Sequence, residues 1–257
     1  MTNTKKYFLL DILSMFDRSM KHIFRSMDTI ITVCIMPIAI MLLMVYVFGG
    51  ALGAQMSRAE YVKYSLPGIL LIAAASSVAY TSARVFTDVR SGFFDRFKSM
   101  PVSASSALWS HVLTSLVSTF LSLIVIVLTA FLIGFRTPAG IISWFGVAGI
   151  MAVFTLALTW IAIIAGLKAS STEGAGAFSY PLVFLPFISS AFLPTETMPS
   201  ALRAFAEHQP VTAVVESIRS FFINKTVGNE IWVALAWCVG IMAIAYFIAM
   251  RAYKKGV

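Results

Sequence analysis

Six long apolar runs alternate with shorter polar segments along the chain. An α-helix needs about 20 residues to cross a bilayer core of roughly 30 Å, and runs of this kind without Asp, Glu, Lys or Arg predict membrane spans. The runs are Thr29–Ala51, Tyr64–Ala83, Ala107–Phe135, Ile141–Leu167, Ala177–Pro194 and Ile231–Met250. Pro181 and Pro186 interrupt the fifth run, which favours a kinked or re-entrant helix there. The pattern predicts an all-α integral membrane protein with six transmembrane helices in one domain, residues 1–257.

The composition agrees with a membrane protein. Of the 257 residues, 59% are hydrophobic and 12% are charged, whereas soluble domains average roughly 45–50% and 25%. Six spans place both termini on one side, which then carries 13 Lys and Arg residues against six on the other side. The positive-inside rule therefore predicts that both termini are cytoplasmic. The net charge of +8 would suggest nucleic-acid binding in a soluble protein, but no nucleic-acid partner is expected for a membrane protein of this kind.

An amphipathic helix is predicted before the first span. Between Leu9 and Met27, apolar residues recur every three or four positions and charged residues lie between them. Such a helix either lies along the cytoplasmic surface of the membrane or packs against the bundle. The apolar positions include Leu13, Phe16, Met20, Ile23 and Phe24.

Catalytic and metal-binding patterns are absent from the sequence. The chain has no HExxH motif, no catalytic carboxylate pair and no GxxxxGK[ST] phosphate loop. Cys34 and Cys238 both lie in apolar runs, where buried thiols are expected rather than metal ligands. The predicted spans carry no charged residue, which disfavours a proton-coupled or sodium-coupled transporter, although carbonyl groups of broken helices can also bind ions. We therefore expect no enzyme, no metal and no directly bound cofactor, and any ATP must be hydrolysed by a partner.

Two segments between the spans carry more pattern than a simple loop. Thr87–Ser103 places Phe93, Phe97 and Met100 on one helical face among charged residues, which predicts a short helix that docks on a partner protein or lies on lipid. Leu193–Phe222 predicts two short helices in a hairpin, one opened by Thr197 or Pro199 and the other capped by Thr212. This hairpin either caps a pathway or braces the bundle.

Three motifs carry a resemblance to a known family. They are Pro67-Gly68-Ile69-Leu70, the Asp88–Ser103 segment with its Asp95-Arg96-Phe97-Lys98 core and Met100-Pro101-Val102-Ser103 end, and the Phe192–Arg219 stretch. Together they resemble the ABC-2 family of permeases, especially the drug-resistance type that includes daunorubicin exporters, and more distantly exporters of polysaccharides and nodulation factors. The resemblance covers nearly the whole chain.

The resemblance implies a half-transporter in the bacterial inner membrane. It would pair with a second permease copy, identical or a sister chain, and with two cytoplasmic ATPase subunits that hold ATP and magnesium. The segment after the second span would be a coupling helix that contacts the ATPase, through Asp88, Arg90, Phe93, Asp95, Arg96, Phe97 and Lys98. The extracellular hairpin would form a gate region with Pro194, Glu196, Met198, Pro199, Phe205, His208 and Pro210.

The expected cargo is a lipophilic or amphiphilic, drug-like compound that leaves the cytoplasm or the inner leaflet. Flexible and aromatic side chains suit cargo of variable shape, although each could equally face lipid or pack between helices. The expected pathway residues are Met36, Met41, Met44, Phe48, Phe178, Phe184 and Phe187. Alternatives are export of a polysaccharide, lipid-linked glycan or other lipid by the same fold, and less favoured a secondary transporter, a channel or a membrane enzyme.

Overall fold

The computed structural model describes residues 12–21, 23, 26–49, 57–92, 104–223 and 228–254, and the regular structure in these residues is helical. Five helical segments are long and apolar enough to cross a membrane. They are Ile31–Phe48, α5 (Arg58–Arg90), α7 (Ala104–Ile133), α8 (Ile141–Lys168) and α13 (Glu230–Lys254). The predicted all-α fold is confirmed, and five of the six predicted spans correspond to these long helices.

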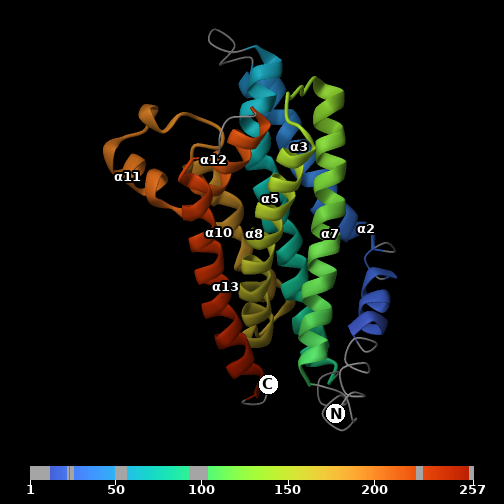
Figure 1. Ribbon diagram of the computed structural model, residues 1–257. Helices are drawn as coiled ribbons and strands as arrows, with labels where there is room; N and C mark the ends of the chain where they lie inside the picture. Colours follow the sequence, from blue (N-terminus) through green and yellow to red (C-terminus); the bar gives the residue numbers. More distant parts are fainter. Residues whose placement is uncertain are drawn as a thin grey trace.

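The N-terminal helix, residues 12–21, and the last residues of α13 lie at the same end of the bundle (Figure 1). The two helices of the hairpin, α11 (Ser200–His208) and α12 (Pro210–Phe222), lie toward the opposite end. We call the first the terminal end of the bundle and the second the hairpin end.

The central helix of the bundle is α5, which is buried along most of its length. It packs against α7, α8, α12 and α3 (Met36–Leu43). At Gly166 of α8 an added Cβ would lie only 2.5 Å from the Ser82 carbonyl oxygen, so the absence of a side chain lets the two helices touch backbone to backbone. A capping box between Ser57 and Glu60 starts α5 six residues before the predicted span. The predicted span is shorter than α5 because it was defined as a run without charged residues, whereas α5 contains charged residues near both of its ends.

The first long segment changes its helical geometry around a proline. Two π-helical turns, Ile31–Ile35 and Met44–Phe48, flank α3, and the short α2 (Met27–Ile30) precedes them. Pro37 cannot donate a hydrogen bond to the carbonyl group of Val33, four residues earlier. The Ser122 hydroxyl of α7 donates to that carbonyl at 2.5 Å, so a neighbouring helix supplies a bond that the proline cannot make.

Further hydroxyl groups join the long helices inside the bundle. Thr119 donates to the Ser77 hydroxyl at 2.8 Å, which links α7 to α5, and the Ser115 and Thr159 hydroxyls lie 2.9 Å apart, which links α7 to α8. All four side chains are buried. Hydrogen bonds of this kind add stability between membrane helices and fix their rotation, because apolar packing alone is weakly directional.

The fifth predicted span is not one continuous helix. The region folds as α9 (Thr172–Ala177), α10 (Ser179–Phe184) and a turn of 3-10 helix, Leu185–Ile188, followed by irregular backbone to Pro194. Pro181 and Pro186 explain the breaks, because each lacks the backbone N–H that a continuous helix requires. Five long helices rather than six are therefore present in the described residues, and the kinked form expected for this run is what the backbone shows.

The predicted N-terminal helix is present, and part of its predicted apolar face packs inward. Residues 12–21 are helical, and the side chains that pack inward are Met15, Met20 and Ile23. Leu13, predicted on the apolar face, is 53% exposed, and Phe16 is half-buried. Phe24 lies outside the described residues. The prediction missed Met15 because the spacing of apolar residues shows which face of the helix is apolar, but not which part of that face contacts the rest of the protein.

Candidate functional site

The last turn of α5 adjoins the predicted coupling segment. Arg90 donates from Nη2 to the Ser170 carbonyl oxygen at 3.1 Å, and its guanidinium lies 5.4 Å from the centre of the Phe86 ring. These contacts hold the end of α5 against the connection between α8 and α9. The other predicted coupling residues, Phe93, Asp95, Arg96, Phe97 and Lys98, lie outside the described residues.

A close contact between Asp88 and His111 joins the two helices that flank the predicted coupling segment. His111 of α7 is buried, and its Nε2 lies 3.0 Å from Oδ2 of Asp88 on α5. The side chain of Asp88 is 20% exposed. The end of α5 and the start of α7 are thus linked directly.

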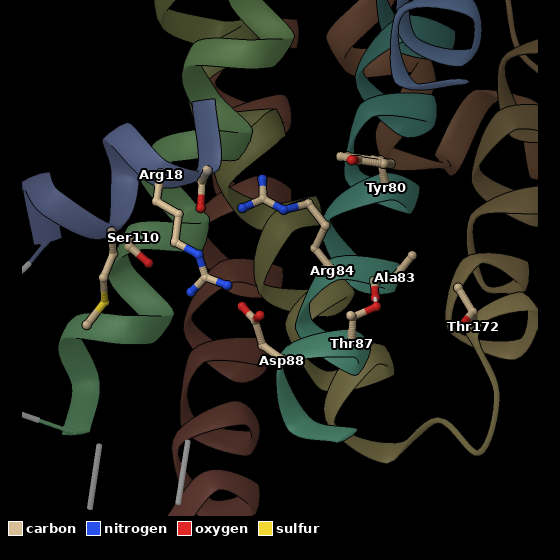
Figure 2. A pocket seen from close by; sticks show the side chains of 10 residues that line it. Arg18, Tyr80, Ala83, Arg84, Thr87, Asp88, Ser110 and Thr172 are labelled. Carbon is tan, nitrogen blue, oxygen red and sulfur yellow. Dashed lines mark hydrogen bonds between the residues drawn. The ribbon is translucent and has the colours of Figure 1, made fainter. Parts of the chain in front are cut away.

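A cavity of about 340 Å³ lies beside this Asp88–His111 contact at the terminal end. Its walls come from the N-terminal helix, α5, α7 and α9, and Figure 2 shows Arg18, Arg84 and Asp88 around the same space. The remaining lining residues are Met15, Ser19, Tyr80, Ala83, Thr87, Ser110 and Thr172. The sequence analysis singled out Asp88 but not the two arginines that accompany it.

A second polar cluster lies at the hairpin end. Arg219 of α12 donates to Glu216 at 2.5 Å, to the Ser190 carbonyl oxygen at 2.7 Å and to the Tyr64 carbonyl oxygen at 3.2 Å. Its guanidinium also lies 3.9 Å from the centre of the Tyr64 ring. Ser190 donates in turn to Glu216 at 2.5 Å. Since the Arg219 side chain is only 14% exposed, this cluster fixes α12 to α5 and to the segment after Ile188.

The Pro67-Gly68-Ile69-Leu70 motif and the Phe192–Arg219 stretch meet next to this cluster. A Cβ on Gly68 of α5 would lie 2.6 Å from the Cβ of Ala191 and 3.0 Å from the Phe192 ring. Phe187 stacks on Phe192 with ring centres 4.9 Å apart. Gly68 is therefore required for the close approach of the Phe192–Arg219 stretch to α5, a role that the sequence pattern did not reveal.

The predicted gate residues lie on the hairpin and on the segment that precedes it. Pro199 precedes α11 and Pro210 opens α12, which begins two residues before the predicted cap at Thr212. Thr212 instead donates to the Ala206 carbonyl oxygen at 2.5 Å and closes the hairpin. The exposed members of the predicted set are Glu196, Pro199, Phe205 and His208, and the half-buried members are Pro194, Met198 and Pro210.

An exposed ion pair stabilises the outer face of α11. Arg203 donates from Nε to Glu207 at 2.7 Å. The hydrogen bond from Arg203 holds the pKa of the Glu207 carboxyl below its ordinary value. His208, the other polar residue here, has its Nδ1 2.8 Å from the Ala204 carbonyl oxygen, so this ring is tied to its own helix.

The predicted pathway residues differ in their exposure and lie on two parts of the chain. Met36, Phe48 and Phe184 are exposed, whereas Met41 is fully buried in the core. Met44, Phe178 and Phe187 are half-buried. The methionines and Phe48 belong to the first long segment, and the other phenylalanines belong to the region from α9 to the 3-10 turn, so they come from two elements that each pack on α5.

Sequence reasoning missed the polar groups that matter most at both ends. Glu216 and Arg219 are half-buried and lie three residues apart on α12, each next to a buried residue, Val215 or Ile218. The sequence did contain a signal for this pair. An acidic and a basic residue three positions apart in a largely apolar helix are expected to pair with each other, because charges are seldom buried unpaired. The Asp88 and His111 pair had no local signal, since its members lie on different helices.

Comparison with known proteins decides the family. A sequence profile of the ABC-2 type transporter family matches residues 11–223. The chain belongs to the ABC-2 type transporter family. The match includes the terminal-end cavity and the hairpin-end cluster, and it confirms the resemblance drawn from the three motifs.

Two ABC-2 relatives are similar over nearly the whole chain. One is the daunorubicin resistance ABC transporter permease protein DrrB1 of Streptomyces coeruleorubidus, with 29% identity over 92% of this chain and 86% of the relative. The other is a probable doxorubicin resistance ABC transporter permease protein, DrrC, of Mycobacterium tuberculosis, with 24% identity over 98% of this chain and 91% of the relative. With its long apolar helices, this ABC-2 chain is a multi-pass membrane protein.

Proposed function

We propose that the chain is the permease subunit of an ATP-binding-cassette exporter that moves a lipophilic or amphiphilic drug-like compound outward. The observation that carries the proposal is the path of α5 from one candidate site to the other. Its 33 residues span about 50 Å at roughly 1.5 Å per residue. Asp88 and Arg90 lie in its last turn, and Tyr64 and Gly68 lie near its start.

Coupling follows from this geometry. A cytoplasmic ATPase subunit binds the 91–103 segment through Arg96, Phe97 and their neighbours. The apolar side chains contribute most of the affinity, and the charged side chains fix how the two proteins align. ATP-driven movement of that segment acts on α5 and α7, which Asp88 and His111 join. Because α5 is packed along its whole length, it transmits the movement to Tyr64 and hence to Arg219 on α12.

The assembly contains two permease copies and two ATPase subunits, and the ATPase subunits bind ATP and magnesium. In each permease both termini are cytoplasmic, and the proline-broken region from α9 to Pro194 is the fifth crossing. Exposed apolar side chains on this region and on the first long segment, such as Phe184 and Met36, supply the surface for lipophilic cargo. The hairpin covers its outer exit.

The drug-resistance names of the two relatives favour a drug-like cargo over a glycan or lipid. Inside-out membrane vesicles from cells that carry the gene are expected to accumulate daunorubicin when ATP is added. Vesicles from a deletion strain, or vesicles given a non-hydrolysable ATP analogue, are the controls and are expected to show no ATP-dependent uptake.

Equal uptake by vesicles from both strains would show that the chain does not export this drug. A build-up of a lipid-linked glycan on the inner leaflet of the deletion strain would instead support the same fold acting on a glycan.

A further inference from the structure

The cavity at the terminal end brings two arginines together in a confined space. Arg18 comes from the N-terminal helix and Arg84 from α5, and both interact electrostatically with Asp88. Figure 2 shows the Arg18 guanidinium directed toward Asp88 and the Arg84 side chain reaching into the same space. The cavity of about 340 Å³ is large enough for a small polar group.

The charges of the described lining residues do not cancel. Among these residues, two guanidinium groups and one carboxylate line the same cavity. A guanidinium has five N–H donors in a fork that matches phosphate and carboxylate geometry. Each arginine can therefore bind a second anionic group while it interacts with Asp88.

The cavity lies near the end of a predicted membrane-spanning helix, where lipid headgroups are expected. Arg84 is six residues, or about 9 Å along the helix, from the end of α5 at Arg90. The charge count along the chain predicts that this end faces the cytoplasm, where the leaflet is rich in anionic lipid. Basic pockets between membrane helices on that side are suited to anionic headgroups.

We propose that this cavity binds a phosphate group, with Arg18 and Arg84 as the residues that hold it. The phosphate belongs either to an acidic phospholipid of the inner leaflet or to a small soluble phosphate, and both offer the same oxygens to the two guanidinium groups. Bound in this way, it bridges the N-terminal helix and α5 next to the Asp88 and His111 pair. The inference rests on the cavity and does not require the exporter function.

Native mass spectrometry of the full-length protein in mild detergent tests the site. Phosphatidylglycerol is expected to bind at least about tenfold more tightly than phosphatidylcholine, because only the former has a net negative headgroup. Arg18→Gln and Arg84→Gln are each expected to remove most of this preference. Lys168→Gln is the control, since Lys168 is an exposed cation at the same end that does not line the cavity.

Competition with inorganic phosphate at about 10 mM distinguishes a lipid headgroup from a soluble phosphate as the ligand. Displacement of phosphatidylglycerol by inorganic phosphate from wild-type protein assigns the site to soluble phosphate, and retention assigns it to lipid. Equal binding of the two lipids with no binding of inorganic phosphate, unchanged preference in both arginine variants, or an equal loss in Lys168→Gln would overturn the proposal. If Arg84→Gln does not elute as a single species, Arg18→Gln decides, because Arg18 lies on an exposed helix face.

Discussion

Replacing Gly68 by alanine is expected to lower the melting temperature of the purified protein by about 5 °C, since overpacking a close contact costs about 1–3 kcal/mol. The new Cβ would lie 2.6 Å from the Ala191 Cβ, a distance that requires α5 and the segment after Ile188 to separate. Thermal unfolding in detergent, followed by size-exclusion chromatography, measures the effect.

The same substitution at Gly149 is the matched control. Gly149 is also in a long helix, but nothing lies within 4 Å of its added Cβ. Alanine there is expected to be neutral or to stabilise by up to about 1 kcal/mol, because glycine is a poor helix former. Equal shifts in the two variants would contradict the close contact between α5 and the Phe192–Arg219 stretch.

Removal of the Arg219 guanidinium is expected to cost about 1.5–3 kcal/mol, the usual range for hydrogen bonds to a charged group, because the Glu216 side chain is 34% exposed. Arg219→Met leaves Glu216 without its charged partner and leaves the carbonyl groups of Ser190 and Tyr64 without these donors. Thermal unfolding again measures the loss. In a double variant with Glu216→Leu, part of the stability is expected to return, because no unpaired charge then remains.

Arg203→Met tests the same chemistry on the surface. Arg203 and Glu207 also form a helical ion pair, at 2.7 Å, but their side chains are 47% and 39% exposed. Loss of that pair is expected to cost less than about 1 kcal/mol. If Arg219→Met is no more harmful than Arg203→Met, the hairpin-end cluster does not hold α12 in place.

The sequence predicts the long helices well, because apolar length alone decides whether a segment can cross a membrane. The predicted span Ile141–Leu167 differs from α8 by one residue at its end. Larger errors occur where charged residues belong to a helix, as Arg58 and Arg84 belong to α5. Charges near helix ends reach polar surroundings while the helix continues, so a search that stops at each charge shortens the span.

The candidate site is less predictable, because it depends on how the helices rotate and pack. Asp88 and His111 are far apart in the sequence, and the position of Met15 rather than Leu13 toward the bundle depends on what the N-terminal helix contacts. Gly68 could be recognised as part of a motif, but its contact with Ala191 requires the proline-broken fifth region to fold back on α5. Local periodicity contains no information about such contacts.

Co-purification in mild detergent tests the central claim, that this permease is driven by a separate ATPase. Tagged wild-type protein from its native cells is predicted to bring down an ATP-binding-cassette ATPase, identified by mass spectrometry, and Arg136→Glu is predicted to bring down the same protein. Arg96→Glu combined with Phe97→Ala is predicted to lose the ATPase while it still elutes as a single species. Absence of any ATPase with the wild-type protein would contradict the account and favour a channel or a secondary transporter.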